Sequence, residues 1–555
     1  EITIEVDEQK KTLSIADTGI GMTEEELVEN LGTIAHSGSR AFFKHMAEAD
    51  RKDVQLIGQF GVGFYSAFMV AKRVRVLTRS YRPEAAGCEW ISDGMGSYSV
   101  GPAEGLRRGT MVILELKEDA GEFASPERIK QIIRRYSNFV PFPIILGGEK
   151  VNTVQAIWTR NKNEIKEDEY KEFYKFIANA YDEPVYRLHF SADAPLAISA
   201  LLFVPGENLE RFGFGKIKPG VNLYCRRILI KQNAEEIVPD WLRFLKGVVD
   251  SEDIPLNISR ETMQDSALIA RLRKAMTGRF LKFLAEQAKA DPEKYGRFWQ
   301  TFGIFLKEGA ASDYAYTKEI APLLRFASSK SEPGKYTSLD DYVERMKDNQ
   351  KYIYFINGPS RESIEAGPYL EAFRVRDIEV LYTHEPIDDF VLQKLSEYRG
   401  KKLVSAERAD LDLPALEQEK QQEVDKLGGL ELRNLTAWIK QALGDKVSEV
   451  RESTRLVDSP AVLVNLDDTI TSSMQRIIQV IHKDAGPAGR YALEINPGHP
   501  LIKNLAAWRQ KDADFAQLAV EQILDNARIA AGLVVDPRDM VDRTYRILER
   551  ALQER

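Results

Sequence analysis

The chain has 555 residues, more than a single hydrophobic core usually supports, so we expect several domains. Its 77 basic and 85 acidic residues give a formal charge of −8, which argues against a nucleic-acid-binding protein. The two cysteines and six histidines are scattered, which argues against a disulfide framework or a common zinc motif and favours a reducing compartment.

The first segments of the chain predict a β-hairpin followed by a capped helix. Residues 2–6 and 11–15 alternate apolar and polar side chains across a short polar turn. Thr23 and Glu26 then have the spacing of a capping box, which predicts a helix that stops near residue 32.

Two glycine motifs form the most informative pair in the sequence. The first, Asp17-Thr18-Gly19-Ile20-Gly21-Met22, ends a strand in which Leu13, Ile15 and Asp17 share one parity, so the carboxylate is expected on the apolar side. A carboxylate there needs a hydrogen-bond donor, and the exocyclic amine of adenine is one.

The second motif, Gly58-Gln59-Phe60-Gly61-Val62-Gly63-Phe64, can present backbone N–H groups to phosphate. A small, polar, lid-like stretch at residues 33–39 lies between the two motifs. The chain has no Gly-Lys-Ser/Thr P-loop, and the glycine spacing differs from the dinucleotide fingerprint. The pair therefore predicts a purine-nucleotide site of another kind.

Later segments predict a mixed sheet-and-helix protein with a helical end. A buried helix is expected at residues 64–70, and another at 125–136 after a Ser-Pro-Glu start signal. Further strands are expected at 74–78, 89–92, 98–100, 111–116, 196–204 and 221–230. A long helix is expected at 264–289, and a solvated connector at 413–427.

The last two helices carry apolar stripes at helical spacing. In the helix at 514–533 the stripe is Ala516, Val520, Ile523, Leu524, Ala527 and Ala531. The helix that follows Asp536-Pro537 has the stripe Val541, Tyr545, Leu548 and Leu552. These stripes suit either a bundle with a second copy of the chain or packing within one domain.

The nucleotide motifs resemble the GHKL ATPases, which include gyrase, histidine kinases, the mismatch-repair protein MutL and the ninety-kilodalton heat-shock chaperones. Three further stretches are similar to the chaperones: residues 31–38 (LGTIAHSG), 249–261 (VDSEDIPLNISRE) and 493–497 (LEINP). The resemblance covers the whole chain and is strongest to the bacterial high-temperature protein G and its mitochondrial paralogue.

This resemblance implies an α+β protein of three domains. They are a GHKL (Bergerat-type) α/β sandwich at residues 1–150, an α/β middle domain at 151–412, and a mostly helical dimerisation domain at 413–555. It also implies an ATP-dependent chaperone that works as a homodimeric clamp on unfolded clients, with ATP and Mg²⁺ as cofactors and with possible co-chaperones.

Matching the motifs residue by residue assigns a role to each candidate site residue. Asp17 would bind the adenine amine, Gly21 and Met22 would line the base pocket, and Thr110 would support a water network. Asn30 would face the sugar, and the lid residues His36, Ser37 and Gly38 would lie near the phosphates, with His36 standing where many relatives carry lysine. The residues expected to wrap the phosphates are Gln59, Phe60, Gly61, Val62, Gly63 and Phe64.

The catalytic residues implied by the resemblance are Arg260, which would reach the γ-phosphate from the middle domain, and Gln264, one turn further on. A permanently charged guanidinium can stabilise the charge that develops on the γ-phosphoryl group. The family's water-activating Glu and its Mg²⁺-holding Asn are expected upstream of Glu1, on a helix before the first strand.

Three other functions remain as alternatives at this point. A DNA-remodelling ATPase related to gyrase or MutL predicts a basic groove, a non-catalytic dimeric scaffold predicts no upstream catalytic helix, and a histidine kinase predicts a phospho-acceptor helix. No signal peptide or bilayer-length apolar run is recognised, so no membrane partner is expected. The expected location is the bacterial cytoplasm, with the mitochondrial matrix as the alternative.

Overall fold

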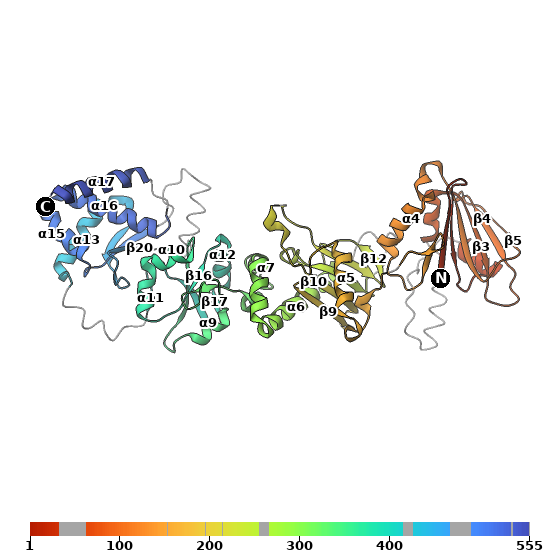
Figure 1. The fold of residues 1–555 in the computed structure, drawn as a ribbon, viewed down its shortest axis with the longest axis horizontal. Helices are drawn as coiled ribbons and strands as arrows, with labels where there is room; N and C mark the ends of the chain where they lie inside the picture. The colour runs from red at the N-terminus through yellow and green to blue at the C-terminus, as the bar shows by residue number, and fades with distance from the viewer. Residues whose placement is uncertain are drawn as a thin grey trace. The chain divides into compact units, whose positions relative to one another are not determined.

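The computed structural model describes residues 1–32, 63–152, 154–194, 196–213, 215–254, 266–413, 426–466, 490–533 and 537–553. The chain divides into two compact units, Glu1–Phe280 and Leu281–Arg555 (Figure 1). None of the described helices is both long and apolar enough to cross a bilayer.

An eight-stranded sheet forms the first part of the chain, in the order β5-β4-β3-β6-β2-β1-β7-β8. Its strands are β1 (Ile2–Asp7), β2 (Thr12–Asp17), β3 (Ala71–Arg79), β4 (Cys88–Ser92), β5 (Tyr98–Pro102), β6 (Gly109–Leu116), β7 (Ile144–Leu146) and β8 (Glu149–Lys150). The helices α1 (Glu24–Leu31) and α4 (Pro126–Ile132) contribute Leu27 and Ile129 to a core shared with this sheet, and α4 lies beside it in Figure 1. Helices therefore cover one face of this sheet, which is the α/β sandwich that the sequence predicts.

Local signals place the first elements correctly. β1 and β2 pair as the predicted antiparallel hairpin. The Thr23 side chain accepts from the Glu26 amide and the Glu26 side chain accepts from the Thr23 amide, so the capping box is confirmed.

The predicted buried helix at 64–70 is instead a 3₁₀ turn, Gly63–Ser66, and the single turn α3 (Ala67–Val70), none of it fully buried. Its four-residue apolar run points partly to solvent, and Met69 is 78% exposed.

A second sheet follows in the first unit, in the order β12-β11-β13-β10-β9. It contains β9 (Tyr186–Ala192), β10 (Ile198–Val204), β11 (Gly220–Cys225), β12 (Ile228–Lys231) and β13 (Lys246–Ser251), and α5 (Glu167–Ala178) packs on it. The single strand predicted at 221–230 is wrong, because the chain reverses between β11 and β12 at Arg226 and Arg227. Both residues have positive φ, 50° and 66°, and a tight turn of two arginines carries none of the usual Asn-Gly signal.

The second unit begins within the long helix α6 (Ser266–Ala290), close to the predicted 264–289. Its first sheet, in the order β14-β16-β15-β18-β17, consists of β14 (Ala327–Ser328), β15 (Tyr352–Asn357), β16 (Val380–Thr383), β17 (Glu397–Tyr398) and β18 (Lys401–Ser405). The accompanying helices are α7 (Pro292–Ser312), α8 (Thr317–Ile320), α9 (Leu339–Arg345), α10 (Arg361–Ala366), α11 (Glu371–Val375) and α12 (Pro386–Leu395).

The last part of the unit joins a three-stranded sheet to helices. The sheet has the order β19-β21-β20, with β19 (Glu449–Glu452), β20 (Ala461–Asn465) and β21 (Tyr491–Ile495). Its helices are α13 (Gly429–Leu443), α15 (Pro500–Lys511), α16 (Ala513–Ala530) and α17 (Pro537–Gln553). The predicted stripe on α16 is buried from Ala516 to Ala531, which confirms it as a core face. Most of the predicted connector, 414–425, lies outside the described residues.

Candidate nucleotide site

Three side chains from three neighbouring strands lie in one row at the end of the first sheet. Asp17 of β2 is directly opposite Thr110 of β6, and Thr110 is directly opposite Thr78 of β3. Residues directly opposite one another in antiparallel strands project from the same face. The two threonine hydroxyls are 3.0 Å apart, so the row is joined by a hydrogen bond. The structure therefore brings together two residues that the sequence singled out and one that it did not.

The loop after β2 crosses the end of β3 and is tied to it. The Met22 amide donates to Oγ1 of Thr78 at 3.0 Å, and the Tyr81 amide donates to the Ile20 carbonyl at 2.7 Å. The Thr78 hydroxyl also donates to the carbonyl of Gly109, at 3.1 Å. Thr78 thus holds the loop after β2 against the sheet, and the sequence motifs gave no sign of this residue. Strand register alone identifies it, because Met22 and Thr78 are 56 positions apart in the sequence.

Two glycines are required here by close approach of the backbone. Gly21 has φ +61°, and a Cβ on it would be 1.8 Å from the carbonyl oxygen of Arg79. Gly109 has φ +126°, and a Cβ on it would be 2.1 Å from the carbonyl oxygen of Asp17. Side chains are disfavoured at such φ values even without a clash. The floor of the site is therefore bare backbone, which lets a flat ring approach closely.

Asp17 is exposed, which corrects the expectation that its carboxylate lies on the buried side. Along the same face of β2 the exposed fraction rises from 6% at Leu13 to 37% at Ile15, and Asp17 lies fully in the exposed class. The parity was right, but the shared core ends before the strand does. Exposure leaves the carboxylate open to a ligand.

The carboxylate itself fits the amino edge of a purine. Oδ1 accepts from the Gly19 amide at 2.8 Å, which fixes the side chain in an Asx-type turn. Among the described residues no donor is bonded to Oδ2. One oxygen is therefore used to orient the group, and the other is free to accept from an exocyclic amine.

The remaining described site residues lie on the elements that flank residues 33–62. Asn30 is half-buried on α1, and Gly63 is exposed at the start of the 3₁₀ turn. The ring of Phe64 packs edge-on against Trp90 with centroids 5.6 Å apart, so this side chain supports the fold. The Tyr65 hydroxyl donates to the Leu31 carbonyl at 3.0 Å, which holds the end of α1 against the 3₁₀ turn.

The other predicted site residues lie outside the described residues. These are His36, Ser37, Gly38, Gln59, Phe60, Gly61, Val62, Arg260 and Gln264. Their roles stay predictions.

The strand that leads toward Arg260, and the turn after it, are held by polar contacts. Asp250 of β13 accepts from Nε1 of Trp158 at 3.0 Å and from the Arg227 amide at 2.9 Å. Asp253 accepts from the Ala197 amide at 2.7 Å. Burial raises the pKa of Asp250, and the contacts with Trp158 and Arg227 oppose that rise. The chain therefore leaves β13 from a firmly held position.

No cluster of three or more His, Cys, Asp or Glu side chains that could hold a metal ion is found in the described part of the chain.

This geometry, an exposed aspartate beside a glycine floor at the end of a sandwich sheet, defines a GHKL-type nucleotide domain. The sequence profile described as "Histidine kinase-, DNA gyrase B-, and HSP90-like ATPase" matches residues 1–90. The profile described as "Hsp90 protein" matches residues 146–555, so the chain belongs to the Hsp90 family.

Relatives of two kinds are similar over the whole chain. "Chaperone protein HtpG" of Desulfitobacterium hafniense is 58% identical over 554 residues, covering 100% of this chain and 90% of that protein. "Heat shock protein 75 kDa, mitochondrial" of Rattus norvegicus is 43% identical over 562 residues, covering 100% of this chain and 80% of that protein. The "TNF receptor-associated protein 1 homolog, mitochondrial" of Dictyostelium discoideum is 42% identical over 556 residues, covering 100% and 78%.

These findings confirm the predicted family, fold class and function. The chain is an ATP-dependent molecular chaperone: it binds and hydrolyses ATP and acts on client proteins. Membership of the Hsp90 family over the full chain goes against the DNA-remodelling ATPase and the histidine kinase, and ATP hydrolysis goes against the non-catalytic scaffold.

Proposed function

We propose that the chain works as a homodimeric clamp, joined through α17 and closed by ATP bound at Asp17. The observation that supports a dimer is the orientation of α17, whose apolar stripe is turned away from its own domain. The exposed fractions of the stripe residues are 48% for Val541, 63% for Tyr545, 51% for Leu548 and 72% for Leu552.

The opposite face of α17 is the one that contacts its own domain, and it does so through charges. Arg543 pairs with Asp525 of α16 at 2.5 Å and with Glu521 at 3.3 Å. Arg550 pairs with Asp512, the N-cap of α16, and the two helices lie side by side in Figure 1. A helix attached to its own domain by its polar face leaves its apolar face for another surface. Fully burying a large apolar side chain is worth about 1.5–3 kcal/mol, so two such stripes are a substantial driving force for pairing.

Sedimentation velocity tests this arrangement. The double variant Tyr545→Ser with Leu548→Ser should shift the protein from dimer to monomer at micromolar concentration. The matched control, Asp542→Ser with Glu549→Ser, changes two exposed residues of the same helix beside the stripe and should remain dimeric. A dimer that survives the first pair would place the interface elsewhere.

At the nucleotide site we propose that Asp17 accepts from the adenine amine while Gly21 and Met22 line the base. Thr110 and its partner Thr78 would hold the ordered water that the family resemblance implies. Asn30 would face the sugar, and residues 36–38 and 59–64 would surround the phosphates. Mg²⁺ would accompany ATP, held largely by phosphate oxygens and water, which is its usual mode in such sites.

Asp17→Asn tests the base contact. The amide keeps the shape of the side chain but loses the charge that accepts from the adenine amine. Hydrogen bonds to charged groups contribute about 1.5–3 kcal/mol, so ATP affinity measured by calorimetry should fall at least tenfold. Undiminished affinity would contradict the proposed pocket.

Hydrolysis would depend on Arg260 reaching the γ-phosphate, with Gln264 beside it. The contacts of Asp250 on β13 and of Asp253 just after it support this, because they hold the chain where it leaves the strand toward the arginine. Arg260→Ala should leave ATP affinity nearly unchanged and lower turnover by roughly 10³-fold or more, as for other arginines that contact a transferred phosphoryl group. An equal loss of affinity and turnover would count against this role.

The domain boundaries at residues 150 and 412, the co-chaperones and a bacterial cytoplasmic or mitochondrial location stay proposals. Similarity to both bacterial and mitochondrial relatives supports the two locations.

A further inference from the structure

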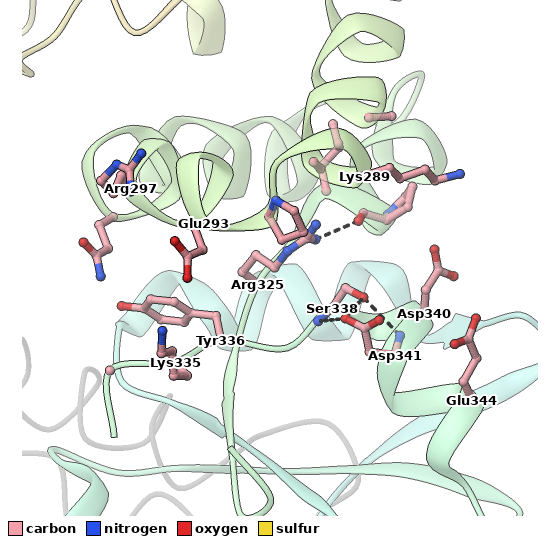
Figure 2. A pocket seen from close by; sticks show the side chains of 18 of the residues that line it. Lys289, Glu293, Arg297, Arg325, Lys335, Tyr336, Ser338, Asp340, Asp341 and Glu344 are labelled. Atoms are coloured by element: carbon pink, nitrogen blue, oxygen red, sulfur yellow. Dashed lines mark hydrogen bonds between the residues drawn. The ribbon is translucent and has the colours of Figure 1, made fainter. Parts of the chain in front are cut away.

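A cavity of about 750 Å³ lies within the second unit, far along the chain from the nucleotide motifs. One wall is the corner between α6 and α7, and the other is the segment that leads into α9 (Figure 2). Its volume is within the range of ligand sites, roughly 300–1,000 Å³.

Part of the cavity lining is apolar. Ala288, Pro292 and Leu323 line the cavity. Figure 2 shows the ring of Tyr336, 40% exposed, on the lower wall next to Lys335. Gly296 of α7 also lines it, and a Cβ built on this glycine meets no atom within 4 Å. Space for a ligand side chain therefore lies directly in front of the helix.

Basic side chains predominate at one end of the cavity and acidic side chains at the other, although each end also holds a charge of the opposite sign. Figure 2 shows Arg297 and Lys335 at one end, with Arg325 toward the middle. Asp340, Asp341 and Glu344 lie at the other end, which they share with Lys289 of the upper wall.

The basic end has charge to offer a ligand. Within the described part of the chain, neither Arg297 nor Lys335 forms an ion pair with a carboxylate. Arg325 stacks over Tyr295 at 4.6 Å and donates to the Pro322 carbonyl at 2.9 Å, so its contacts are with a ring and a carbonyl. These contacts fix the guanidinium in place, and its charge helps to lower the pKa of Asp341 in the same cavity.

The acidic end is partly compensated already. Asp340 pairs with Arg399 at 2.7 Å, and Asp341 accepts from the hydroxyl and amide of Ser338. The hydrogen bonds from Ser338 lower the pKa of Asp341 against the opposing effect of burial, so this carboxylate is ionised at neutral pH. Glu344 is exposed at the rim. This end therefore favours a cationic group and disfavours a further anion.

Charges spread along one cavity match an extended polypeptide better than a compact anion. A phosphate needs several donors that converge on one point, whereas Arg297 and Lys335 share their end of the cavity with Glu293. In an extended chain, alternate side chains point to one side at intervals of about 7 Å, which can present one charge, an apolar residue and the opposite charge in turn.

We propose that this cavity binds extended client segments that have acidic side chains at one end, an apolar side chain in the middle and a basic side chain at the other end. Acidic residues meet Arg297 and Lys335, the apolar residue lies on the neighbouring ring of Tyr336, and the basic residue meets Asp341 and Glu344. The proposal rests on the client binding of the family and assigns it a place and a sequence preference.

The test measures binding of a fluorescein-labelled octapeptide to the full chain by anisotropy at low salt. The peptide carries two glutamates at one end, leucines in the middle and two lysines at the other end. Comparison peptides replace the charged residues by glutamine, or the lysines by glutamates. The mixed-charge peptide should bind at least tenfold tighter than either.

Two variants locate the binding, each with a matched control. Gly296→Leu fills the cavity and should weaken the mixed-charge peptide at least tenfold. Gly278→Leu makes the same change on α6, where a Cβ also meets no atom within 4 Å, outside the cavity, and should leave binding unchanged. Lys335→Glu should weaken the mixed-charge peptide but not the glutamine peptide, whereas Lys318→Glu, an exposed lysine of α8, should weaken neither.

The results separate this site from the chaperone function itself. ATP turnover should be the same in all four variants, which shows that the chain is folded. Unchanged peptide binding in Gly296→Leu, or equal weakening in Gly278→Leu, would overturn the site while leaving the chaperone activity standing. Binding of the glutamate-only peptide as tight as the mixed-charge peptide would overturn the assigned preference.

Discussion

Replacing Gly21 with alanine should disrupt the nucleotide site through the backbone, without removing any side chain that contacts ATP. Two costs add at this position. At φ +61° a residue with a Cβ is disfavoured by roughly 1–2 kcal/mol. The Cβ would also lie 1.8 Å from the Arg79 carbonyl oxygen, well inside the 3.0 Å below which something must shift. Relieving such overlap typically costs about 1–3 kcal/mol, giving about 2–5 kcal/mol in all.

The shift has a defined direction, because the loop must move away from the end of β3. That movement stretches the hydrogen bonds from the Met22 amide to Thr78 and from the Tyr81 amide to Ile20. Hydrogen exchange at these two amides should accelerate by roughly 30-fold to 5,000-fold, since each 1.4 kcal/mol is a factor of ten. ATP affinity, measured by calorimetry, should fall at least tenfold.

Gly105→Ala is the matched control. Gly105 has a similar φ of +74°, but a Cβ on it meets no atom within 4 Å. Only the conformational cost of about 1–2 kcal/mol applies there, and ATP affinity should not change. If the two alanine variants lost equal stability, or if Gly21→Ala bound ATP normally, the argument from close backbone approach would be wrong.

Three further predictions concern positions that hold the fold around the sites. Thr78→Val removes the acceptor of the Met22 amide, which should cost about 1–3 kcal/mol in hydrogen-exchange protection and weaken ATP binding in the same titration. Glu494→Gln should destabilise the last sheet by about 3–5 kcal/mol in calorimetric unfolding. The reason is that Glu494 is 3% exposed and neutralises both Arg451 and the equally buried Arg455. The control Glu449→Gln changes the exposed partner of Arg451 and should cost less than about 1 kcal/mol. Burial lowers the pKa of His189, which bonds to the Tyr170 hydroxyl and the Trp158 carbonyl. As the pH falls, the unfolded chain therefore binds a proton at this histidine before the folded chain does. The stability that the neutral His189 contributes above about pH 6.5 should then be lost at lower pH. His189→Gln should flatten this pH dependence in denaturant titrations between pH 5 and 8.

Several features could be predicted from local sequence because local interactions cause them. The capping box at Thr23 and Glu26 satisfies backbone groups within one turn, and the stripe on α16 follows from helical periodicity. The site motif around Asp17 and Gly21 was also recognisable, since the residue types needed for a base pocket lie within six positions.

Other features depended on contacts between distant segments. Strand pairing brought Thr78 to Thr110 and Met22, and no local pattern encodes a register between separate strands. The turn at Arg226 and Arg227 is stabilised by Asp250, which lies on another strand, so its own residues gave no signal.

Amphipathic pattern and burial are separate properties, as Asp17 and α17 show. Alternation correctly assigned Asp17 to the face of Leu13, and helical spacing correctly assigned Tyr545 and Leu548 to one stripe. Whether each face is covered depended on where the shared core ends and on the ion pairs of Arg543 and Arg550 with α16. The amino-acid sequence by itself determined the family, the chemistry of the nucleotide motif and most of the elements. The tertiary structure alone decided which of those faces are open to a ligand or a partner, because exposure depends on what packs against a segment and not on the segment itself.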